Sequence, residues 1–158
     1  MKEHIDWHET AEIYSKAEMY EDAIACYDRA IELNAVDDVA WFRKGFTFFL
    51  LDKNADELKC YNKALEINPK NIDALENKGA YLLRLNRDQE AMECFDEALK
   101  ITQRNVCIWF NKGMALKKQR KYWEAVFCFD KGLELCSDDE DALQCVDEVL
   151  SKLVELES

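Results

Sequence analysis

The sequence predicts an all-α fold of stacked antiparallel helix pairs, and three observations lead to this prediction. First, the 158 residues include only four glycines and one proline, whereas an all-β fold needs many turns rich in these residues. Second, the strong helix formers Ala, Leu, Glu, Lys and Arg are abundant. Third, the sequence repeats with a period of 34 residues. The length suits one domain.

The repeats align without insertion or deletion as four rows followed by a tail. The rows are residues 4–37, 38–71, 72–105 and 106–139, and the tail is 140–158. Size and polarity recur in most columns of the alignment. The fourth column is large (Trp7, Trp41, Leu75, Trp109), the eighth is small (Ala11, Gly45, Gly79, Gly113) and the twenty-fourth is aromatic (Tyr27, Tyr61, Phe95, Phe129).

Each row contains two stretches with apolar residues at the i, i+3, i+4, i+7 spacing of a helix. Asp37, Asn71, Asn105 and Asp139 end the rows, where each can cap the helix that follows. One helix pair cannot bury its apolar face alone, so the pairs must stack. We expect helices near 4–17, 20–34, 38–51, 54–68, 72–85, 88–102, 106–119, 122–136 and 140–155.

The tail predicts a helix that caps the last repeat. Its apolar residues Leu143, Val146, Leu150, Leu153 and Val154 fall on one helix face. We expect this face to pack on the preceding pair and the acidic residues to meet solvent.

This pattern resembles the tetratricopeptide repeat family over residues 4–139. The resemblance implies a right-handed superhelical solenoid in which four repeats and a capping helix form one domain, 1–158. Glu57 departs from the family pattern, because a small residue usually stands at that position, so looser packing is expected there. A proline near the repeat end appears only as Pro69.

Charge and hydropathy exclude several classes of partner. The net charge of −12 disfavours nucleic acids and anionic membrane surfaces. No apolar run reaches the ~18 residues that span a bilayer, and residues 1–6 contain no apolar signal segment. We therefore expect a cytoplasmic protein without membrane insertion.

Four of the seven cysteines stand one repeat apart, which suggests either a redox or metal ladder or a repeated packing residue. Stacked helices are ~8–10 Å apart, too far for a disulfide, whose Cα atoms lie within ~7 Å. No C-x-x-C pair is present either. We favour buried thiols. These four cysteines, called the cysteine ladder below, are Cys26, Cys60, Cys94 and Cys128.

Nothing in the sequence predicts catalysis or a cofactor. Gly-rich phosphate loops and nucleophile elbows are absent. His4, His8 and Glu12 share one helical face and could hold a metal ion. A solvated acidic face is the alternative that we favour, so we expect a protein that is not an enzyme.

In the family that the sequence resembles, the first helix of each repeat lines a concave groove. Aromatic residues and Met at such positions are typical of interface cores. We therefore predict a scaffold or adaptor that binds an apolar or amphipathic peptide or helix of a partner. The alternatives are a self-associating module, such as a homodimer, and an accessory metal-binding module. The predicted partner-binding residues are Phe42, Arg43, Phe46, Phe49, Asn77, Arg84, Phe110, Asn111, Met114 and Lys117.

Overall fold

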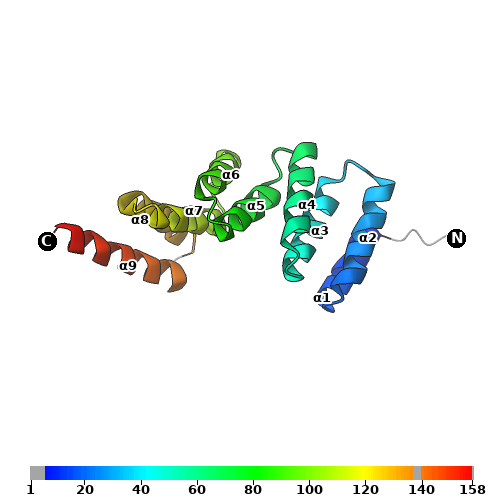
Figure 1. Cartoon of the computed structure of the whole chain (residues 1–158), viewed down its shortest axis with the longest axis horizontal. Coiled ribbons are helices and arrows are strands. Elements are labelled where there is room, and N and C mark those ends of the chain that lie inside the picture. The colour runs from blue at the N-terminus through cyan, green and yellow to red at the C-terminus, as the bar shows by residue number, and fades with distance from the viewer. Residues whose placement is uncertain (1–5, 137–139, 158) are drawn as a thin grey trace. The chain divides into compact units, whose positions relative to one another are not determined.

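A computed structural model describes residues 6–136 and 140–157, and within these ranges the regular structure is helical (Figure 1). The predicted all-α class is confirmed. The chain divides into two compact units, Met1–Asn77 and Lys78–Ser158, with the boundary inside helix α5. No helix in the described ranges is long and apolar enough to cross a membrane.

The N-terminal unit contains two helix pairs and the start of α5. Its helices are α1 (Trp7–Lys16), α2 (Tyr20–Leu33), α3 (Asp38–Leu50), α4 (Asn54–Ile67) and the first part of α5 (Ile72–Arg84). Within each pair, α1 lies beside α2 and α3 beside α4 (Figure 1). Some of the alanines, the tyrosines Tyr27 and Tyr61 and the ladder cysteines fill the space between them, and these residues are fully or nearly fully buried.

The C-terminal unit continues the same pattern. It contains the remainder of α5, then α6 (Asp88–Ile101), α7 (Val106–Lys118), α8 (Tyr122–Leu135) and α9 (Glu140–Glu157). Helix α7 packs on both α6 and α8, and α9 packs on α8. Phe95, Phe129 and Ile108 are completely buried in its core.

The predicted helix starts and N-caps are largely confirmed. The side chains of Asp37, Asn71 and Asn105 each accept a hydrogen bond from the backbone N–H three residues on, at 2.9, 2.9 and 3.2 Å. Asp6 caps α1 in a similar way. His4, the other residues expected to start that helix before Asp6, and the expected cap Asp139 lie outside the described residues.

The turn inside each helix pair has the same left-handed geometry in all four repeats. The fifteenth residue of each row has a positive φ of 55–59°, although it is never glycine: Glu18, Asp52, Asn86 and Arg120. The N–H of the next residue donates to the carbonyl five residues back, as from Met19 to Tyr14 at 2.9 Å. This is a Schellman cap, which ends the first helix and turns the chain into the second.

Two expectations about packing can be compared with the structure. Glu57, where looser packing was expected, is only 1% exposed, so this acid lies inside the helix packing. In α9 Val149 is completely buried, and Val146 and Leu153 of the predicted face are partly buried, whereas Leu143, Leu150 and Val154 are exposed. The buried face of α9 is therefore rotated from the predicted one, because apolar residues occur on more than one side of this helix.

Candidate functional site

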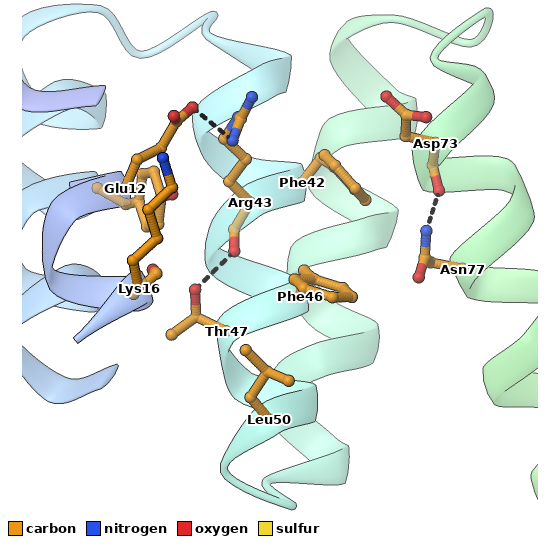
Figure 2. A pocket seen from close by; sticks show the side chains of 11 residues that line it. Glu12, Lys16, Phe42, Arg43, Phe46, Thr47, Leu50, Asp73 and Asn77 are labelled. Atoms are coloured by element: carbon orange, nitrogen blue, oxygen red, sulfur yellow. Dashed lines mark hydrogen bonds and ion pairs between the residues drawn. The ribbon is translucent and has the colours of Figure 1, made fainter. Parts of the chain in front are cut away.

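The N-terminal unit contains a cavity of about 400 Å³, called the α3 groove below. Side chains from α1, α2, α3 and the start of α5 line it (Figure 2). Phe42, Phe46 and Leu50 follow one another along the face of α3, at the i, i+4, i+8 spacing that aligns side chains on a helix. Phe46 remains 40% exposed and Leu50 41%. The groove therefore presents an apolar surface to solvent.

Aromatic stacking holds the phenylalanines in place. The ring of Phe42 stacks on the buried ring of Tyr61, with centroids 6.1 Å apart. The centroid of the Phe46 ring lies 6.5 Å from that of Phe42 and 5.8 Å from that of Phe49. Such contacts add about 0.5–1.5 kcal/mol each beyond area burial. The surface is thus preformed, which lowers the entropic cost of binding.

Polar groups stand on the two sides of this apolar strip. On the α1 side, Glu12 Oε1 lies 2.7 Å from Arg43 Nη1. Lys16 stands one turn further along α1 and forms no ion pair within the described residues. On the α5 side, the amide of Asn77 donates to the backbone carbonyl of Asp73 at 2.8 Å (Figure 2). The groove can therefore offer a cation on one side and a carboxylate on the other.

Tyr27 and Thr47 also line the groove, and the sequence analysis did not assign them to it. Burial raises the pKa of the Tyr27 hydroxyl, and hydrogen bonds with Arg43 and Ser15 oppose this rise. Thr47 Oγ1 donates to the carbonyl of Arg43 at 2.9 Å. Tyr27 belongs to a core column of the repeat, so position alone gave no signal that it faces the groove.

A second cavity, of about 340 Å³, lies in the C-terminal unit and is called the α7 groove below. Arg84, Phe110, Asn111 and Met114 line it, together with Lys118. The Lys118 ammonium donates to the carbonyl of Leu83 at 3.2 Å and to the Asn86 amide oxygen at 3.1 Å. Like the α3 groove, this cavity combines aromatic and aliphatic side chains with amide and cationic groups, but it has no carboxylate among its lining residues.

The structure thus sorts the predicted partner-binding residues into three groups. Phe42, Arg43, Phe46 and Asn77 line the α3 groove, and Arg84, Phe110, Asn111 and Met114 line the α7 groove. Phe49 and Lys117 line neither. Phe49 contacts Phe46, and the Lys117 ammonium pairs with Glu148 of α9. Lys117 therefore contacts the capping helix, and the prediction that it lines a groove is wrong.

The cysteine ladder is buried, and none of the cysteines in the described ranges forms a disulfide. Burial raises the pKa of each ladder thiol, to about 11 for Cys60 and for Cys128. These thiols are packing groups at neutral pH. His8 Nε2 lies 2.8 Å from Asp37 Oδ2, and residues 6–136 and 140–157 hold no cluster of three His, Cys, Asp or Glu suited to a metal ion. His4 lies outside these ranges.

Three models of the tetratricopeptide repeat match the sequence, at residues 9–72, 60–93 and 106–139. The chain belongs to the tetratricopeptide repeat family. Members of this family share a fold that serves protein–protein interaction scaffolds and is typically non-catalytic. No curated protein sequence matches the chain.

Solved structures agree on the fold. PilF of Pseudomonas aeruginosa superimposes with a TM-score of 0.86 at 21% identity, covering 94% of this chain and 68% of that one. A crystal structure of MamA gives 0.82 at 12% identity, covering 92% and 79%. YrrB, described as a tetratricopeptide repeat protein with an unusual peptide-binding site, gives 0.78 at 22% identity, covering 92% and 75%. The predicted helix-pair solenoid is confirmed.

Proposed function

We propose that this protein is an adaptor whose α3 groove binds an apolar or amphipathic segment of a partner protein. The observation that carries the proposal is the exposed apolar strip of Phe42, Phe46 and Leu50 inside a preformed cavity. Aromatic residues in such pockets commonly act as binding hot spots. The α7 groove, with Phe110 and Met114, offers a second contact of the same chemistry.

The charges beside the strip favour an amphipathic ligand over a purely apolar one. A segment with an acid near Lys16 and a base near Asp73 would meet opposite charge on both sides. Its apolar side chains would lie on the phenylalanines between them. Affinity would come mainly from these apolar contacts, and the charges would select the orientation.

The test is affinity capture from an extract of the source organism with the immobilised full chain. We compare wild type, Phe46→Ala and the control Leu33→Ala by quantitative mass spectrometry. Leu33 is 74% exposed on α2 and lies outside both grooves. Truncation of a hot spot costs about 2 kcal/mol or more, so Phe46→Ala should lose proteins that wild type and Leu33→Ala both retain.

Phe110→Ala tests the α7 groove in the same experiment. Alanine is preferable to a charged residue because the Phe110 ring lies 5.7 Å from the buried Phe129 ring. Circular dichroism checks that each variant keeps its helicity. If Phe46→Ala and Phe110→Ala both capture the wild-type set of proteins, neither groove is the binding site.

Self-association is a second candidate, and one observation favours it. Leu143, Leu150 and Val154 form an exposed apolar stripe on α9, and such a helix face can pack against another copy. Sedimentation of wild type and Leu150→Glu separates the two candidates. A wild-type dimer that becomes a monomer in this variant supports self-association. If wild type is a monomer at every concentration, self-association is excluded and only the adaptor proposal remains.

A further inference from the structure

Helix α8 carries two large aromatic side chains where the other repeats carry small or polar ones. At the eighteenth position the four repeats have Glu21, Ala55, Gln89 and Trp123, and at the twenty-second they have Ala25, Lys59, Glu93 and Phe127. All eight side chains are exposed, and Trp123 and Phe127 are 60% and 56% exposed. Three repeats adopt the fold without these aromatics, so the fold does not require them.

The two aromatics border a cavity of about 510 Å³ between α6, α7 and α8, called the α8 pocket below. It shares no lining residue with the α3 or α7 groove. Trp109 and Leu116 at its base are buried, and the Trp109 indole N–H donates to the carbonyl of Gln103 at 2.9 Å. The Trp109 ring meets Phe127 edge to face, with centroids 6.2 Å apart. The pocket is therefore apolar and preformed.

The charges at the pocket favour a cationic ligand. The one lysine in the lining, Lys112, pairs with Asp96 at 2.6 Å. Glu124 also lines the pocket, and its carboxylate forms no ion pair in the described part of the chain. Lys131 Nζ lies 5.9 Å from the centroid of the Phe127 ring, so this ring accepts an ammonium group. The Glu124 carboxylate is thus available to a second cation.

Size and charge together disfavour a second copy of this chain as the occupant. The volume of the α8 pocket is that of a small-ligand site, so it has room for one or two inserted side chains and not for the extended face that a stable dimer buries. Another copy would also bring a net charge of −12. We propose that the α8 pocket binds a basic segment of a partner protein, which inserts a bulky apolar side chain against Trp123 and Phe127 and places Lys or Arg beside Glu124.

NMR of the tryptophan indole N–H groups in the full-length protein tests this proposal site by site. The probe is a short acetylated helical peptide of leucine and lysine, and the matched probe replaces each lysine by glutamate. The Trp123→Gln variant assigns the Trp123 signal. We expect the lysine peptide to shift the Trp123 and Trp109 signals saturably, and to bind this site about tenfold more tightly than the glutamate peptide does.

The control variant is Trp123→Gln/Phe127→Ala, which installs residues that other repeats already carry at these positions. Its circular dichroism should match wild type, and its Trp109 signal should no longer respond to the lysine peptide. Glu124→Gln, a single surface change, should reduce the preference for the lysine peptide. An unmoved Trp123 signal at saturating peptide, equal affinity for both peptides, or signal changes caused by protein self-association alone would overturn the proposal.

Discussion

At the residue scale, three glycines stand where an aromatic ring occupies the place of a side chain. A Cβ at Gly79 would lie 2.5 Å from the ring of Phe95, and one at Gly113 would lie 2.5 Å from Phe129. At Gly45 the corresponding distance to Tyr61 is 2.8 Å. The two columns of the repeat, small and aromatic, are thus one packing contact between paired helices. Gly132 differs, because a Cβ at this position would lie 3.8 Å from its nearest neighbour, the Cβ of Trp109.

Gly79→Ala and Gly132→Ala should therefore change stability in opposite directions. Overpacking against the fully buried Phe95 ring should lower the free energy of unfolding by about 1–3 kcal/mol. Gly132→Ala should raise it by about 0.5–1 kcal/mol, because alanine is the better helix former and space is available. Urea denaturation followed by circular dichroism measures both. Equal effects of the two substitutions would refute this account of the packing.

The buried thiols make a prediction about alkaline pH. The pKa of Cys60 and of Cys128 is about 11 in the folded chain, above the ordinary value of 9.0, mainly because burial disfavours the thiolate. Between these values the unfolded chain has released the protons and the folded chain has not. The contribution of each thiol to the free energy of unfolding is therefore fully present below pH 9. As the pH rises from 9 towards 11, each thiol lowers the free energy of unfolding by at most about 1.4 kcal/mol per pH unit.

We expect the free energy of unfolding of wild type to fall more steeply above pH 9 than that of Cys60→Ala/Cys128→Ala. The comparison between the two proteins removes the contribution of lysines and tyrosines that titrate in the same range. Denaturant unfolding at pH 8, 9 and 10 gives the slopes. Parallel curves for the two proteins would show that these thiols ionise in the folded chain as readily as in the unfolded one.

At the element scale, the sequence predicted most helix boundaries within one residue, from α2 (Tyr20–Leu33) to α8 (Tyr122–Leu135). Capping residues and apolar spacing define these ends locally, so no long-range information is needed. The left-handed turn at the fifteenth position was not predicted, because glycine, its usual signal, is absent there. The rotation of α9 was missed for another reason: its apolar residues allow two faces, and only the packing on α8 selects Val149.

Glycine at the left-handed positions should stabilise the helix pairs. Glu18→Gly removes the steric cost of a positive φ of 59° and should raise the free energy of unfolding by about 0.5–1 kcal/mol. Asn86→Gly should raise the free energy of unfolding by less, because asparagine tolerates this conformation well. Thermal and urea unfolding of both variants provide the comparison. A destabilised Glu18→Gly protein would contradict the proposed strain.

At the scale of the whole molecule, the predicted first helices α3 and α7 line the two cavities, but the sequence did not predict the partners of every side chain. The repeat places Phe42, Phe46 and Phe110 on first helices, and each remains partly exposed. Lys117 was expected at a groove, yet it pairs with Glu148. That contact depends on how α9 packs, which a local periodicity does not encode. The α3 and α7 grooves each lie inside one unit, and their binding of a partner stays a prediction.

Site-specific photocrosslinking tests most directly whether the α3 groove binds a partner protein. The photoreactive residue p-benzoylphenylalanine replaces Phe46 in one protein and Leu33 in the other, because both positions are exposed and only Phe46 lines the groove. After irradiation in extract, we expect a discrete partner adduct from position 46 and none from position 33. Adducts from position 33 alone, or equal adducts from both positions, would show that the α3 groove is not the binding site.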